Sequence, residues 1–200
     1  MKNKKDESIK LRILFESVRL FSEKGFHGTS MRDIASSAEC SLPMLYYYYK
    51  SKDELFYEVA YTELIELIQR LNKEMKVAES FKETFLNAMK QRKELSDYDK
   101  AVYKLSLKVL LGFDGDSKVR RDLIEWESGR IERTKQILMT YLPKDDNLNI
   151  ITNVFTRVME NMTEKIILLD EQITDEMITD EIELLMKSFA MNINNVSTSR

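Results

Sequence analysis

The sequence predicts an all-α protein of about nine helices, short ones before residue 56 and longer ones after it. Gly and Pro are scarce, at 5 and 2 of 200 residues, and charged residues make up 32% of the chain. This composition favours long helices with few sharp turns. Apolar residues recur at helical spacing along the whole chain, and no alternating run is long enough to predict a sheet.

The first two helices are separated by a glycine. The first is expected over about Ser8–Lys24 and ends at Gly25, since one of its faces is apolar. The residues on that face are Ile13, Leu14, Ser17, Val18 and Phe21. The stretch "SMRD" has the pattern of a capping box, with Ser30 as N-cap and Asp33 three residues later. It predicts a short second helix over Met31–Ala38.

The third helix is expected to start at Ser41 as N-cap, with Pro43 in the first turn, where its missing N–H costs nothing. The stretch "SKDE" is a second capping box, from Ser51 to Glu54, and opens a long fourth helix that runs toward Met75.

Five longer helices are expected in the rest of the chain, and the first of them is capped by Ser80 with Glu83. The "GFDGDS" stretch is expected to be a loop, and the "NNVSTSR" tail to be disordered. The predicted ranges are Phe81–Leu95, Asp97–Leu111, Lys118–Tyr141, Leu148–Leu169 and Asp175–Ile193.

Charge and motif content exclude several classes of protein. The net charge is −3, and it is unevenly distributed. Residues 1–60 carry ten Lys/Arg and nine Asp/Glu, a balance of +1. Residues 61–200 carry the other 21 Lys/Arg and 25 Asp/Glu, a balance of −4. One cysteine and one histidine cannot build a disulfide framework or a zinc site within one chain. The charged amino terminus has no apolar segment, and no apolar run is long enough to cross a membrane. The expectation is a soluble cytoplasmic protein without cofactor or metal.

An enzyme is not expected either. The sequence contains no P-loop, no G-x-G-x-x-G, no G-x-S-x-G and no H-E-x-x-H pattern. A Ser-His-Asp site would need His27, which lies in the loop between the first two helices.

Two short helices joined by a three- to four-residue turn predict a helix-turn-helix. The stretch from about Arg12 to Phe56 strongly resembles the amino-terminal domain of TetR-family transcription regulators. The resemblance rests on "F-x-E-K-G-F", Thr29 and Ser30, "DIA", "S-x-x-x-LY" and "K-x-K-x-EL". It implies a helix-turn-helix DNA-binding domain over residues 1–56 and an effector-binding and dimerisation domain over 57–200.

Four consecutive tyrosines, Tyr46 to Tyr49, follow Pro43 in the third helix. Because successive helical residues point about 100° apart, Tyr49 shares a face with Leu45, which we assign to the core. Tyr47 then points outward, and Tyr46, Tyr48 and Met44 lie on the flanks. Outward phenols can donate to phosphate oxygens, and their rings can pack on sugars or a thymine methyl group. A purely structural role, in which all four cover the core, is the alternative.

The resemblance implies further DNA contacts in and around the second helix. Arg32 would reach a base edge or a phosphate, with a salt bridge to Asp33 or Glu16 as the alternative. Thr29 and Ser30 would bind a phosphate through their hydroxyls, and Lys52 would bind another. The full predicted DNA-contact set is Thr29, Ser30, Arg32, Ser41, Leu42, Pro43, Met44, Tyr46, Tyr47, Tyr48 and Lys52.

Two positions depart from the family pattern. Glu39 stands where the family usually has glycine, and a non-Gly residue at positive φ costs about 1 kcal/mol. Tyr48 stands where the family most often has histidine. Tyrosine keeps a hydrogen-bond donor at this position but loses any positive charge. Both departures bear on base preference.

Apolar stripes near the carboxy terminus predict a homodimer, since each is wide enough for an intermolecular helix bundle. The alternative is that the stripes face only the core of their own chain. The predicted interface residues are Ile151, Phe155, Val158, Met162, Ile166, Ile182, Leu185 and Phe189.

Methionines and aromatic residues predict a pocket for a small apolar or amphipathic effector. The candidates are Tyr103, Trp126, Met89 and Met159, with Glu127 and Arg130 as possible polar anchors or solvated charges. The expected function is a ligand-responsive regulator that binds double-stranded operator DNA, most simply a repressor released by its effector. The alternative is a helical small-molecule-binding or partner-binding protein with weak or no DNA binding.

Overall fold

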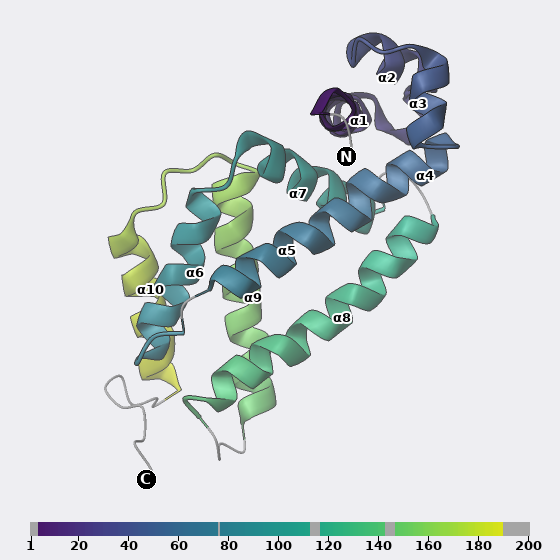
Figure 1. Ribbon diagram of the computed structural model, residues 1–200. Helices are drawn as coiled ribbons and strands as arrows, with labels where there is room; N and C mark the ends of the chain where they lie inside the picture. Colours follow the sequence, from purple (N-terminus) through teal and green to yellow (C-terminus); the bar gives the residue numbers. More distant parts are fainter. Residues whose placement is uncertain (1–3, 76, 113–116, 143–146, 190–200) are drawn as a thin grey trace. The chain divides into compact units, whose positions relative to one another are not determined.

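The computed structural model describes residues 4–75, 77–112, 117–142 and 147–189, and all regular secondary structure in these ranges is helical (Figure 1). The tail and most of the "GFDGDS" loop, for which predictions were made, lie outside the described residues. The elements are α1 (Lys4–Gly28), α2 (Met31–Ser37), α3 (Leu42–Tyr48), α4 (Lys52–Tyr57), a π-helix η1 (Glu58–Thr62), α5 (Glu63–Glu74), α6 (Phe81–Lys93), α7 (Asp97–Leu110), α8 (Lys118–Met139), α9 (Leu148–Ile167) and α10 (Asp175–Ser188). The predicted all-α class is confirmed.

Hydroxyl side chains begin most of these helices. At six of them an N-cap oxygen accepts a hydrogen bond from the backbone N–H three residues on; the caps are Ser30, Ser41, Ser51, Ser80, Ser96 and Thr174. The predicted capping box at Ser30 is complete. At Ser51, the Glu54 carboxylate instead accepts from the backbone N–H of Lys50, at 2.8 Å. The short helices are therefore fixed largely by local side-chain contacts.

The long helix predicted from Ser51 toward Met75 contains one wider turn. Its backbone runs through α4, η1 and α5, and η1 has π-helical hydrogen bonding. The buried Ser106 hydroxyl contacts the carbonyl oxygens of Ala60 and Val102, each at 2.9 Å. The Ser106 hydroxyl thus contacts a backbone carbonyl within the π-helix itself. The sequence pattern did not indicate this turn, because its apolar spacing stays close to that of an α-helix.

The chain forms two compact units. The first comprises residues 1–69 and 96–124, and the second comprises 70–95 and 125–200. In the first unit α1 packs against α2, α4, η1 and α7, and α2 packs against α3. Its core includes Ile13, Val18, Phe21, Ile34, Leu45, Leu55, Val59, Val102 and Leu105. This unit extends beyond the predicted boundary at residue 56, because α7 packs directly on α1 and η1.

In the second unit α6 packs against α9 and α10. Phe155 forms its centre, with ring centroids 4.7 Å from Phe81 and 6.0 Å from Phe189. The Tyr141 hydroxyl shares a hydrogen bond of 2.6 Å with that of Thr84 and reaches the Ala78 carbonyl at 2.9 Å. The second unit therefore has an aromatic core of its own.

The burial in this core corrects part of the predicted dimer interface. Five of the eight predicted residues are buried within the single chain: Ile151, Phe155, Met162, Ile166 and Ile182. Their side chains contact their own unit, so they are core residues. Val158, Leu185 and Phe189 are half-buried, and their interface role stays a prediction.

No helix in the described part of the chain combines the length and the apolar character that a membrane span requires.

Candidate nucleic-acid interface

The turn between α2 and α3 keeps the left-handed conformation that its position requires. Glu39 has φ 50°, and its N–H donates to the Ser36 carbonyl at 3.2 Å. The Cys40 N–H donates to the Ala35 carbonyl at 3.0 Å. Glu39 therefore takes the conformation of the usual glycine, which is strained for a residue with a Cβ.

The four tyrosines divide as the helical phase predicts. Leu45 and Tyr49 are buried, Tyr47 is 77% exposed and Tyr46 is 46% exposed. The Tyr47 and Tyr48 rings meet edge to face, with centroids 5.2 Å apart. The outward side of α3 is thus formed by aromatic rings that carry hydroxyl groups.

Tyr49 differs from its neighbours in backbone and environment. It follows the last helical residue of α3 and has extended dihedrals, φ −135° and ψ 113°. Its hydroxyl is buried without a hydrogen-bond partner among the described residues. Burial, with smaller contributions from the Glu58 and Glu63 carboxylates, raises the pKa of the Tyr49 phenol. This side chain belongs to the core.

The amino-terminal end of α2 is open to solvent. Ser30 donates its hydroxyl to the Asp33 carboxylate at 2.6 Å, and the Ser30 N–H donates to the same oxygen at 3.0 Å. These two bonds lower the pKa of Asp33. Arg32 is exposed, and Glu16, one of its two possible partners, is paired with Arg19 at 2.8 Å. Ser30 and Arg32 are therefore accessible to a ligand.

Thr29 is not accessible, which corrects its predicted role in phosphate binding. Its side chain is 2% exposed. Its hydroxyl lies 2.9 Å from the Gly25 carbonyl and 3.1 Å from the Leu20 carbonyl, so it is directed into the unit. Thr29 thus holds the segment that follows Gly25. At Gly25 itself, φ is 71° and the helical backbone is interrupted, as the sequence predicts.

Lys52 also points inward. Its ammonium donates to the carbonyl oxygens of Phe26 at 2.8 Å and Thr29 at 3.0 Å, and it lies 4.2 Å from the centroid of the Phe26 ring. Two of its three N–H donors are therefore used within the chain.

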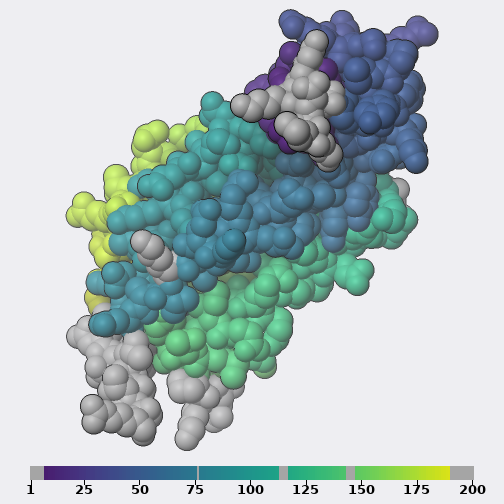
Figure 2. Space-filling model, viewed as in Figure 1, coloured from purple at the N-terminus to yellow at the C-terminus, as the bar shows by residue number. Residues whose placement is uncertain are grey.

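The remaining predicted contacts lie in the first turn of α3. Ser41 and Pro43 are exposed, whereas Leu42 and Met44 are half-buried. We define the α2–α3 surface as Ser30, Arg32, Ser41, Pro43, Tyr46 and Tyr47. The atoms of α2 and α3 lie at the surface of the first unit (Figure 2). Residues 24–52 carry four Lys/Arg and two Asp/Glu, a balance of +2, so this region is more basic than the chain as a whole.

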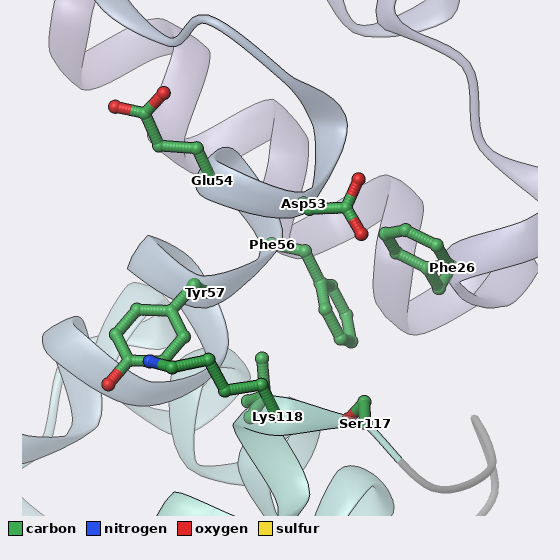
Figure 3. A pocket seen from close by; sticks show the side chains of 8 residues that line it. Phe26, Asp53, Glu54, Phe56, Tyr57, Ser117 and Lys118 are labelled. Atoms are coloured by element: carbon green, nitrogen blue, oxygen red, sulfur yellow. The ribbon is translucent and has the colours of Figure 1, made fainter.

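A cavity of about 310 Å³ lies in the first unit beside α4. It is lined by Phe26, Asp53, Glu54, Phe56, Tyr57, Ser117, Lys118 and Val119 (Figure 3). The Lys118 ammonium lies 4.1 Å from the Tyr57 ring centroid, and both Lys118 and the Tyr57 hydroxyl contact the Asp122 carboxylate, at 3.0 and 2.8 Å. Burial and the bond to Asp122 raise the pKa of Tyr57.

The predicted effector residues are not brought together at either cavity described here. Met89 is fully buried, whereas Tyr103, Trp126 and Met159 are half-buried. The second cavity, of about 370 Å³, lies on α9 and α10 and is lined by Asn153, Val154, Arg157, Val158, Asn161 and Glu181. The pocket prediction for the four residues therefore stays a prediction.

Glu127 and Arg130 form a structural ion-pair network and not a free polar anchor. The Arg130 guanidinium contacts both Glu127 and Glu160, and Arg157 contacts Glu160 at 3.1 Å. Arg130 is well covered, with 17% of its side chain exposed. The sequence indicates the pair on α8 by its i,i+3 spacing, but nothing in it indicates the partner on α9.

The geometry agrees with comparisons to known proteins. Residues 13–59 match the model of the family described as bacterial regulatory proteins, tetR family. The Staphylococcus epidermidis negative transcriptional regulator IcaR of the biofilm operon icaADBC is 40% identical over 48 residues, 24% of this chain and 26% of IcaR. The chain thus matches its curated relatives over only about a quarter of their length.

Similarity of fold extends over most of the chain. A TetR-like transcriptional regulator from Rhodococcus sp. RHA1 superposes with a TM-score of 0.70 at 23% identity, over 92% of this chain and 97% of that one. The structure of AibR in complex with isovaleryl coenzyme A and operator DNA superposes with a TM-score of 0.60 at 15% identity. The superposition covers 90% of this chain and 97% of the AibR chain. The matched family consists of bacterial regulatory proteins, which agrees with the predicted class of transcription regulator. Residues 13–59 are therefore similar to the tetR family of bacterial regulatory proteins, and the chain has a fold similar to that of TetR-like transcriptional regulators.

Proposed function

We propose that the protein is a transcriptional regulator that binds double-stranded operator DNA through the α2–α3 surface. The observation that carries the proposal is the outward face of α3. It exposes Tyr46 and Tyr47 while Leu45 and Tyr49 hold the same helix to the core. A helix anchored on one side and aromatic and polar on the other has the form of a reading helix in the major groove.

The individual contacts follow from chemistry. Tyr47 and Tyr46 would donate phenolic hydroxyls to phosphates or pack their rings on sugars and thymine methyl groups. Arg32 would reach a base edge or a phosphate. Ser30, Ser41 and the exposed amino-terminal end of α2 would bind backbone phosphates, while Leu42, Pro43 and Met44 would supply apolar contacts. Tyr48 would brace Tyr47 through the contact between their rings.

We propose further that the protein acts as a homodimer in the cytoplasm. A two-fold dimer places two reading helices about one helical turn of DNA apart, roughly 34–36 Å or a multiple of it. The half-buried Val158, Leu185 and Phe189 and the exposed Leu184 on α9 and α10 are candidates for the interface.

A small apolar or amphipathic molecule is the proposed effector. Support comes from the eleven methionines of the chain and from the similarly folded AibR, whose structure contains both isovaleryl coenzyme A and operator DNA. Binding would shift the population of dimers away from the spacing that fits the operator. IcaR is a negative regulator, which favours repression as the direction of control.

Selection from a random duplex library, followed by shift assays at two salt concentrations, tests this proposal. We expect enrichment of a palindromic site and binding that weakens steeply with salt, because phosphate contacts release counterions. Absence of any salt-sensitive shift would contradict the proposal and favour a helical ligand-binding or partner-binding protein. Adding acyl chains and acyl-CoA thioesters to the shifted complex tests the effector class separately.

A further inference from the structure

We propose that Lys52 is a positioning residue, which holds the segment between α1 and α2 and thereby sets the amino-terminal end of α2 for DNA. This inference rests on the proposed function for its effect on DNA, but the contact itself can be tested in the free protein. Lys52 lies at the first position of α4, 26 residues from Phe26 and 23 from Thr29, whose carbonyl oxygens it contacts.

The location of the lysine is unfavourable in its own helix. The amino-terminal end of a helix carries partial positive charge, so an ammonium there is repelled. The Lys52 side chain avoids this by reaching back to the carbonyl oxygens of Phe26 and Thr29, which carry partial negative charge. Its contact with the face of the Phe26 ring, at 4.2 Å, adds a cation–π interaction.

The segment that Lys52 contacts departs from regular helical backbone. Gly25 has φ 71°, and the Thr29 N–H reaches the Phe26 carbonyl at 3.4 Å. The Thr29 hydroxyl holds this segment from the α1 side, and the Lys52 ammonium holds it from the α4 side. The Phe26 ring packs against Phe56 of α4 at 5.0 Å. Phe26, Thr29 and Lys52 therefore tie the beginning of α4 to the segment that immediately precedes Ser30.

The consequence for DNA binding is specific. Ser30 and Arg32 follow this segment directly, so their position relative to α3 depends on it. A lysine whose only role is to bind a phosphate would leave the free protein unchanged when replaced, and would reduce the salt dependence by about one counterion per contact. A positioning lysine would alter the free protein and leave the salt dependence nearly unchanged.

Lys52→Met tests the inference, because methionine keeps the apolar stem and removes the ammonium. Lys50→Met is the matched control, since Lys50 is exposed and lies two residues away in the segment between α3 and α4. The first measurement is hydrogen exchange of the Thr29 and Ile34 amides in the free protein. We expect exchange about tenfold faster in Lys52→Met, as for loss of hydrogen bonds from a charged donor, and unchanged exchange in Lys50→Met.

The second measurement is the affinity for the selected duplex as a function of salt. Lys52→Met should bind about tenfold more weakly or worse than Lys50→Met, with a slope against salt no lower than that of the control. Unchanged amide exchange in Lys52→Met would overturn the inference. So would a slope lowered by about two per dimer relative to the control, which would assign Lys52 to the phosphates. If the wild-type protein binds no duplex, the proposed function fails, and the exchange measurement still decides whether Lys52 holds the segment.

Discussion

The first unit and the second unit of this chain use similar apolar spacing for different purposes. At α3, Leu45 and Tyr49 are buried four residues apart, and Tyr46 and Tyr47 between them are exposed. In α9, Ile151, Phe155 and Met162 are buried at a similar helical spacing. The outward face of α3 is aromatic and polar, whereas the stripe of α9 forms a core with Phe81. Helical spacing therefore identifies a buried face in both units, and only the residues on the other face suggest what each helix does.

The buried face of α3 gives the largest expected effect in the first unit. Tyr49→Ala should lower the free energy of unfolding of this unit by about 3–5 kcal/mol, because it empties a buried aromatic site. Hydrogen exchange of amides in α2 and α3 measures the change. Tyr49→Phe should cost little or be stabilising, because the hydroxyl that it removes is buried without a partner. A stable Tyr49→Ala variant would contradict the assignment of this face to the core.

The buried face of α9 should respond in the same way. Phe155→Ala should destabilise the second unit by about 3–5 kcal/mol, since the ring is packed between Phe81 and Phe189. The only tryptophan of the chain, Trp126, lies in this unit and reports its unfolding in urea by fluorescence. The matched control is Ile150→Ala on the same helix, which is 59% exposed and should change the free energy by no more than about 0.5 kcal/mol. Equal effects of the two variants would refute the distinction between core and surface.

A polar contact in the first unit should have a smaller effect. Tyr57→Phe removes the hydroxyl that contacts Asp122 at 2.8 Å. We expect a loss of about 0.5–1.5 kcal/mol in the free energy of unfolding, as for a single hydrogen bond. Tyr61→Phe, whose ring packs on Tyr57 at 5.0 Å, provides the control. If both variants unfold like the wild type, the Tyr57 hydroxyl does not stabilise the unit.

The turn between α2 and α3 should give the smallest effect, and one of opposite sign. Glu39→Gly should stabilise the first unit by up to about 1 kcal/mol, because glycine adopts φ 50° without strain. Ser36→Gly, at an exposed helical position three residues earlier, should instead destabilise it by about 0.5 kcal/mol. Destabilisation by Glu39→Gly would mean that the glutamate side chain supports the turn.

These comparisons explain what could be predicted from the sequence. Helix starts were predictable because a cap such as Ser30 and its partner Asp33 lie three residues apart. The phase of α3 was predictable because Leu45 and Tyr49 are four apart. The direction of the Thr29 and Lys52 side chains was not, since their partners lie on α1 or in the segment after it. For Lys52 these partners are 23 and 26 residues distant in the chain.

In the second unit, too, contacts between residues far apart in the sequence could not be predicted. The stripe of α9 indicated burial correctly, but a stripe does not specify whether the covering helix belongs to the same chain or to a partner. For Phe155 the cover is α6, through Phe81. Likewise, the Arg130–Glu160 contact joins α8 to α9, and residue spacing carries no information about which helices become neighbours.

The central claim is that the outward face of α3 contacts DNA, and Tyr47→Ala tests it most directly. The measurement is the affinity for the selected duplex, with Leu111→Ala as the control because Leu111 is 69% exposed in the same unit. We expect Tyr47→Ala to lose at least about tenfold in affinity, since a hydrogen bond to a charged phosphate is removed. Its free energy of unfolding should stay within about 0.5 kcal/mol of the wild type. A folded Tyr47→Ala variant that binds the duplex as tightly as Leu111→Ala would contradict the claim.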